Sequence, residues 1–255
     1  MKPESNPLQR LVPDYETTTV ASHVSGLEFE APPGEERPFV MCNFAATVDG
    51  KAAIEGRSGP IAGPADSELL LGLRSRADAV MVGAGTLRAE KYGRMIADPE
   101  VRAKREEEGL SADPLAVIVS GRLQLPWEIP LFTEGAGKIV VFTSSDEEPP
   151  ETETPLQVIR HEGGVDLTKA LALLRREWDI EVLLCEGGPH LHGDLWREDL
   201  VDELFLTIGP RLAGGDAPGI LSGDLRQPAE LQLIGLLADE EGALMCRYVR
   251  VGSGG

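Results

Sequence analysis

From residue 38 onward, short apolar runs alternate with polar or amphipathic stretches along the chain. Near-continuous apolarity over a few residues is typical of a strand that is buried on both faces of a sheet. Runs of this kind occupy residues 39–48, 79–82, 115–119, 138–142 and 180–185. Such strands alternating with helices predict an α/β fold of three layers, with a mostly parallel sheet between helices.

Helix start signals lie between these runs. Gly63-Pro64 and Asp98-Pro99 each place proline at a first helical position, and Asp166 precedes leucines that share one helical face. Residues 189–197 form a further predicted helix. The charged pairs of the helix after Asp98-Pro99, such as Arg102 with Glu106, indicate a solvated face.

The two ends of the chain differ from this pattern. Apolar runs at 231–237 and 243–251, joined by polar residues, predict a C-terminal β-hairpin that makes the sheet mixed. Residues 1–37 are rich in Pro, Glu, Thr and Ser; their apolar residues between Leu8 and Tyr15 can dock, and 28–37 is predicted to be a linker. The chain therefore divides into an N-terminal extension, 1–37, and a single domain, 38–255.

Composition narrows the function. The net charge of −19 excludes nucleic acid and anionic membranes as partners, and any phosphate site must be a local basic pocket. The three cysteines, Cys42, Cys185 and Cys246, lie in separate apolar runs without a CxxC pair and are interpreted as buried thiols. No apolar stretch is long enough to span a bilayer, and a cytoplasmic location is expected.

Two apolar runs end in glycine turns. The first reads Val82-Gly83-Ala84-Gly85-Thr86, and the second reads Cys185-Glu186-Gly187-Gly188-Pro189. Glycine lets a pyrophosphate approach the backbone, and the N–H groups at a helix start attract anions. Each turn alone can simply end a strand, and Glu186 can simply cap a helix, but the pair favours a dinucleotide enzyme.

The chain resembles the reductase half of the bacterial riboflavin-pathway deaminase/reductase, which has a dihydrofolate reductase-like fold. The similarity covers roughly residues 38–250. It is carried by Thr47-Val48-Asp49-Gly50-Lys51, by Gly63-Pro64 with Leu73-Arg74, by Asp78-Ala79 through Thr86, by Glu186-Gly187-Gly188-Pro189 and by 200–204. It implies NADPH-dependent reduction of 5-amino-6-(5-phosphoribosylamino)uracil, by hydride transfer to ribose C1, and a homodimer.

The resemblance also implies site residues. Cofactor contacts fall on Pro60, Gly83, Gly85, Thr86, Glu90, Ser120, Gly187, Gly188, Pro189, His190 and Leu191. Substrate contacts fall on Asn43, Ser58, Arg74, Arg94 and Glu186, with Arg74 suited to the 5-phosphate. Glu186 is the best placed proton donor, with water as the alternative, and Asp49 closes the first strand near the nicotinamide, although Asp-Gly is also an ordinary turn.

The chain departs from the family pattern in the pocket. Relatives carry Lys at position 43 and Trp at position 60, where this chain has Asn43 and Pro60. The arginine that relatives carry in the segment after the first glycine turn is missing here, and Arg94 is the candidate to replace it. The zinc motifs of the deaminase half are absent from the sequence, and no metal is expected. His190 and His192 diverge on a helix, so they are a poor metal pair.

Two alternatives stay open. The departures at Asn43 and Pro60 also suit a reductase of another heterocycle, such as dihydrofolate. A non-catalytic NADPH-binding protein is a further alternative. Preference for NADPH over NADH would need a cation or hydroxyl cluster near the 2′-phosphate, which either Ser120-Gly121-Arg122 or Thr143-Ser144-Ser145 can supply.

Overall fold

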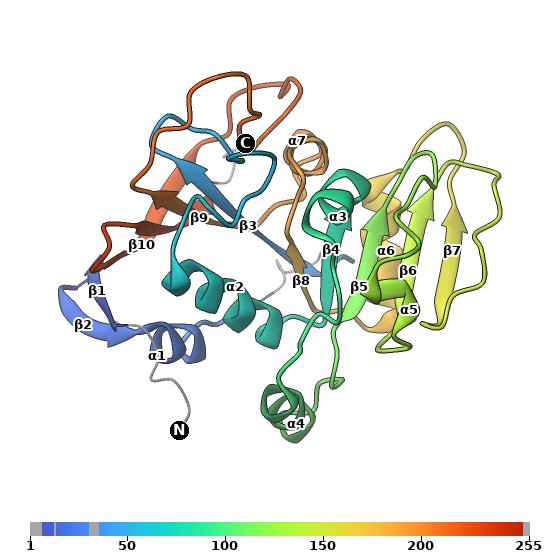
Figure 1. Ribbon diagram of the computed structural model, residues 1–255, viewed down its shortest axis with the longest axis horizontal. Coiled ribbons are helices and arrows are strands. Elements are labelled where there is room, and N and C mark those ends of the chain that lie inside the picture. Colours follow the sequence, from blue (N-terminus) through green and yellow to red (C-terminus); the bar gives the residue numbers. More distant parts are fainter. Residues whose placement is uncertain (1–6, 13, 31–35, 252–255) are drawn as a thin grey trace.

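The computed structural model describes residues 7–12, 14–30 and 36–251, and within them the strands form one eleven-stranded sheet (Figure 1). Its order is β2-β1-β10-β11-β9-β3-β8-β4-β5-β6-β7. The strands are β1 (Pro7–Val12), β2 (Glu16–Thr19), β3 (Phe39–Thr47), β4 (Ala79–Gly83), β5 (Leu115–Val119), β6 (Ile139–Thr143), β7 (Leu156–Arg160), β8 (Val182–Cys185), β9 (Glu203–Gly209), β10 (Leu231–Asp239) and β11 (Leu244–Arg250).

Helices connect and cover these strands. They are α1 (Val20–Ser25), α2 (Pro64–Arg76), α3 (Ala84–Glu90), α4 (Pro99–Glu107), α5 (Pro130–Thr133), α6 (Leu167–Trp178) and α7 (Pro189–Arg197). Proline stands at the start of α2, α4 and α7, and Asp166 caps α6 by accepting from the Lys169 amide, as the sequence predicts. None of the helices in the described ranges is long and apolar enough to cross a membrane.

The pairing confirms a mostly parallel, mixed sheet. Strands β9, β3, β8, β4, β5, β6 and β7 pair in parallel, whereas β11, β10, β1 and β2 add antiparallel pairs at one end. The predicted C-terminal hairpin is β10 with β11. Parallel neighbours need crossover connections, and helices supply most of them, whereas β6 and β7 are joined by residues 144–155, which form no helix.

Alternation along the central strands builds two cores. Val80 and Val82 of β4 face a cluster that includes Leu69 and Leu73 of α2, while Ala79 and Met81 face a cluster that includes the leucines of α6. Because both faces are covered, these strands read as continuous apolar runs rather than as alternating ones. All three cysteines are buried as free thiols.

The N-terminal segment extends the sheet, which the sequence did not predict. β1 pairs with β10, and β2 pairs with β1, so the hairpin edge is covered (Figure 1). Leu8 is buried, whereas Leu11 and Tyr15 are exposed. Residues 28–30 and 36–37 carry neither helix nor strand, and the rest of the expected linker lies outside the described residues. Strand β7 and the short helix α5 were also missed.

Candidate functional site

A cavity of about 490 Å³ opens at the carboxyl ends of β4, β5 and β8, beside the middle of β3. This volume suits a small-molecule site, and the strand ends of an α/β sheet are where ligands usually bind. One side, here called the glycine-turn wall, comprises Gly83, Gly85, Thr86 and residues 188–191. Another part of the lining, here called the α2 wall, is built around Asn43 of β3 and Asp66 of α2.

The two glycine turns pack directly against each other. The Gly83 amide donates to the Gly187 carbonyl at 2.7 Å, across a cis Gly187–Gly188 peptide. A Cβ at Gly188 would lie 2.7 Å from Thr86 Oγ1, and one at Gly187, whose φ is +86°, would lie 2.6 Å from the Phe44 ring. Only glycine fits this wall without a shift of its neighbours.

Helix α7 aims its N-terminus at the cavity. Gly188 is the N-cap and Pro189 the first helical residue, and both line the cavity with His190 and Leu191. The first-turn amides of a helix have no intrahelical acceptors and carry the positive end of the dipole. An anionic group is therefore stabilised here even in a protein of net charge −19.

Glu186, directly before this turn, is the centre of a buried hydrogen-bond cluster. Its carboxylate accepts from Arg74 Nε at 2.6 Å and Nη2 at 2.7 Å, and from the Tyr92 hydroxyl at 2.6 Å. The Arg74 and Glu186 side chains are 14% and 4% exposed. Burial lowers the pKa of Arg74, but the charge and hydrogen bonds of Glu186, together with those of Tyr92, outweigh burial, and the pKa is raised. Burial, with the Glu186 charge, raises the pKa of Tyr92 well above its ordinary value, so the phenol stays protonated.

This cluster changes what two predicted residues can do. Arg74 does not line the cavity, because its guanidinium is bound to Glu186 and to the Met95 carbonyl. Glu186 does line it, but its carboxylate already accepts three hydrogen bonds. Tyr92, which the sequence did not single out as a site residue, also lines the cavity.

Ser58 and Glu90, predicted for substrate and cofactor respectively, meet each other. The Ser58 amide and hydroxyl both donate to Glu90 Oε1 at 2.9 Å. Both residues line the cavity, so this contact ties the loop after β3 to helix α3 at the cavity mouth.

The α2 wall contains buried oxygens that lack partners. Asn43 Oδ1, Asp66 Oδ1 and Thr207 Oγ1 are all buried and make no hydrogen bond to any described residue. Thr207 pairs with Ala45 across β9 and β3, two residues along from Asn43. Burial raises the pKa of Asp66, and the nearby Thr207 hydroxyl opposes the rise.

Other predicted residues lie outside the cavity wall. The Asp49 carboxylate accepts from Thr47 Oγ1 at 2.6 Å and from the Ala213 and Gly214 amides. These hydrogen bonds, the one from Thr47 first, lower its pKa to about 2. Asp49 thus ties the end of β3 to the loop after β9. Gly187, Ser120 and Pro60 also fall outside the lining, although Gly188 and Gly121 are part of it.

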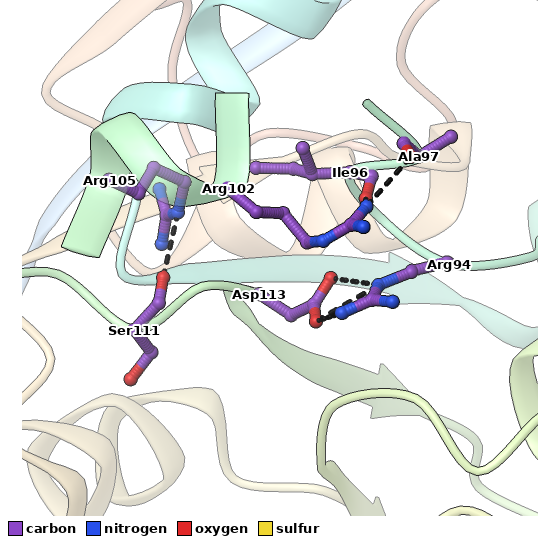
Figure 2. A network of polar contacts seen from close by, with 7 residues as sticks. All are labelled: Arg94, Ile96, Ala97, Arg102, Arg105, Ser111 and Asp113. Atoms are coloured by element: carbon purple, nitrogen blue, oxygen red, sulfur yellow. Dashed lines mark hydrogen bonds and ion pairs between the residues drawn. The ribbon is translucent and has the colours of Figure 1, made fainter. Parts of the chain in front are cut away.

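Arg94 does not line the cavity and instead belongs to a separate network of polar contacts (Figure 2). Its guanidinium binds the Asp113 carboxylate, and Arg102 donates to the Ile96 and Ala97 carbonyls rather than to Glu106. Arg105, which is 1% exposed, donates to carbonyls at the end of α2 and to Ser111. These arginines hold the segment between α3 and β5. Of the three, Arg102 was interpreted as part of a solvated face and Arg94 as a substrate contact.

His192 is a core residue beneath the glycine-turn wall. Its ring stacks on Phe44 with centroids 4.2 Å apart, and its nitrogens contact the Ile220 carbonyl and the Trp196 indole. Burial lowers its pKa to about 4. Both ring nitrogens are occupied by these contacts, so His192 and His190 do not act as a pair.

Comparisons with known proteins agree on one kind of protein. The family model described as the RibD C-terminal domain matches residues 38–245. A 2,5-diamino-6-ribosylamino-4(3H)-pyrimidinone 5′-phosphate reductase of Archaeoglobus fulgidus is 32% identical over 193 residues, which are 74% of this chain and 88% of that protein. The protein of the same name from Methanothermobacter thermautotrophicus is 31% identical, over 74% of this chain and 85% of its own. A pyrimidine reductase-like protein of Corynebacterium diphtheriae superposes with a TM-score of 0.75 at 23% identity, covering 92% of this chain and 99% of that one.

Proposed function

The chain belongs to the RibD C-terminal domain family, and from that membership we propose that it reduces a 6-(5-phosphoribosylamino)pyrimidine to its ribitylamino product with NADPH. The resemblance, the fold class and the assignment to the reductases of riboflavin biosynthesis are confirmed by these relatives. The cofactor, the form of the base and the site residues are the proposed part. The observation that carries the proposal is one cavity with a backbone-lined anion site on one side and a polar wall on the other.

The glycine-turn wall fits a dinucleotide. A Cβ at Gly85 would meet no atom within 4 Å, so the backbone is open to close approach there. We assign the pyrophosphate to the first turn of α7 and the nearby ribose to Thr86 and Glu90. When bound, the reduced nicotinamide supplies the hydride for the reaction.

On the substrate, the ring-opened ribose presents an imine-like C1. A C1–H bond forms, the C=N π pair moves to nitrogen, and that nitrogen takes a proton. Glu186 serves to hold Tyr92 and the cavity wall, because a carboxylate that accepts from Arg74 and Tyr92 is a poor proton donor. Water is therefore assigned as the proton source.

The substrate phosphate needs a cation other than Arg74. Arg57 lies on the loop that carries Gly56 and Ser58, which both line the cavity. Arg57 is exposed, so a 5′-phosphate bound to it can remain partly solvated. We assign the phosphate to Arg57.

The experiment follows NADPH oxidation by the purified protein with freshly prepared phosphoribosylaminopyrimidine, with dihydrofolate in parallel. We expect turnover of the pyrimidine alone. Gly85→Val should abolish NADPH binding, while Gly59→Val, which has equal room but does not line the cavity, should leave it intact. Failure to bind either NADPH or NADH would refute the proposal.

A further inference from the structure

The loop after β3 offers two neighbouring hydrogen-bond donors to an anion, and a carboxylate of the protein already accepts from both. The Ser58 amide and hydroxyl donate to the same oxygen of Glu90, each at 2.9 Å. A backbone N–H beside a hydroxyl, next to Arg57 in the sequence, is a donor set that a phosphate oxygen would use. Glu90 therefore takes the place of a phosphate on this loop, as an internal anion in the cavity lining.

The rest of the lining offers a phosphate little positive charge. Among the described residues that line the cavity there is no lysine or arginine, whereas Glu186 and Asp194 are acidic. Arg74 and Arg94, which the sequence assigned to the substrate, are each held in an ion pair with a carboxylate. His190 is the one basic residue of that lining, and it belongs to the glycine-turn wall, which we assign to the cofactor.

Arg57, to which we assign the substrate phosphate, attracts it only weakly. Arg57 is exposed, so its pair with a phosphate stays hydrated and is screened by salt. Glu55 lies in the same turn, which backbone hydrogen bonds between Ile54 and Arg57 close, and Glu90 contacts the next residue. Both carboxylates repel a phosphate that approaches Arg57, so the phosphate adds little to the affinity for the substrate.

We propose that Glu90 acts as an internal anion that makes the 5-phosphate dispensable, so the enzyme also reduces the dephosphorylated ribosylaminopyrimidine. This inference rests on the proposed function and widens its substrate class. The reaction is unchanged, because the phosphate on C5 takes no part in it. NADPH gives a hydride to C1, the C=N π pair moves to nitrogen, and that nitrogen takes a proton from water. Glu90 is thereby assigned as a specificity-determining residue.

Kinetics with the phosphorylated substrate and with its phosphatase-treated form test this assignment. The two kcat/KM values of the wild type should differ by about tenfold or less, which is the most that an exposed ion pair supplies. Glu90→Ala removes the carboxylate and frees both Ser58 donors, so it should raise the preference for the phosphorylated substrate by about tenfold or more. The ratio of two substrates on one protein cancels any effect on cofactor binding. The control, Glu107→Ala, changes an exposed residue outside the cavity and should keep the wild-type ratio.

A binding readout separates this inference from the proposed function. Calorimetric titration with the ribitylamino product, with and without its 5′-phosphate, needs no turnover. Wild-type affinities within about tenfold of each other, and a gain confined to the phosphorylated product in E90A, support the inference even if neither substrate is reduced and the proposed function fails. A larger wild-type preference for the phosphorylated compounds, an E90A protein with the wild-type preference, or binding of neither product would overturn it.

Discussion

The two walls of the cavity are built by different means. The glycine-turn wall is made of backbone, from two short segments in which strand, turn and helix follow one another in sequence. The α2 wall is made of side chains from β3, β9 and α2, which approach only after the sheet forms. A wall made of backbone can be inferred from a motif, whereas a wall made of side chains depends on tertiary contacts.

Glu186 connects the second glycine turn to α2 through its ion pair with Arg74. Removing its charge should lower the stability of the protein more than the other changes considered below. Glu186→Gln leaves the buried Arg74 guanidinium without its charge partner, so we expect the free energy of unfolding to fall by about 3–5 kcal/mol. Denaturant unfolding measures it. The control, Glu198→Gln, breaks an exposed pair with Arg226 and should cost at most about 1 kcal/mol. Equal effects of the two substitutions would show that the cluster does not support the cavity.

His192 supports the glycine-turn wall only while it is neutral. Its pKa is about 4 in the folded protein and about 6.5 in the unfolded chain, so the unfolded chain binds more protons between these values. Stability is therefore full above about pH 6.5 and falls by up to about 3 kcal/mol as the pH drops toward 4. An NMR titration of the His192 ring is the direct check. Protonation near pH 6.5 in the folded protein would contradict it.

Gly187→Ala tests whether the second glycine turn requires a residue without a Cβ at this position. The substitution strains a positive φ and pushes a methyl group into Phe44, whereas Gly163→Ala strains a positive φ in open space. The difference between the two isolates the clash, and we expect Gly187→Ala to cost about 2 kcal/mol more. Thermal unfolding compares the variants. A Gly187→Ala protein as stable as the control would show that the wall tolerates a side chain.

Replacing Arg122, the residue after Gly121, should have the smallest effect, a change in cofactor affinity. It is exposed and follows Gly121, which lines the cavity. Arg122→Ala should weaken NADPH binding about tenfold, which is about 1.4 kcal/mol, and leave NADH binding unchanged. Calorimetric titration with both cofactors tests this, with Arg226→Ala as the control. An unchanged ratio of affinities would remove Arg122 from recognition of the 2′-phosphate.

Much of the fold could be predicted because its strands are buried on both faces. The runs at 79–82 and 115–119 became β4 and β5 almost residue for residue, and proline located the start of α7. β1 and β2 were missed because both strands are short and partly polar, and the pairing of β1 with β10 joins residues far apart in the sequence. The expected division at residue 37 is not tested by this pairing.

The residues of the candidate site likewise include some that the sequence could predict and some that it could not. Gly83, Thr86 and Gly188 line the cavity, where the motif placed them. Arg94 does not line the cavity, because its guanidinium pairs with Asp113, which lies 19 residues further along the chain. Asp66 was missed because an acidic residue in a first helical turn is read as complementing the helix dipole.

The most direct measurement follows deuterium from the 4-position of reduced NADPH into the product of a single turnover. The proposed function transfers the hydride to C1 of the ring-opened ribose, so we expect one deuterium in the product, at C1 of the ribityl chain. A product without deuterium at C1, or deuterium at a ring position of the pyrimidine, would contradict it.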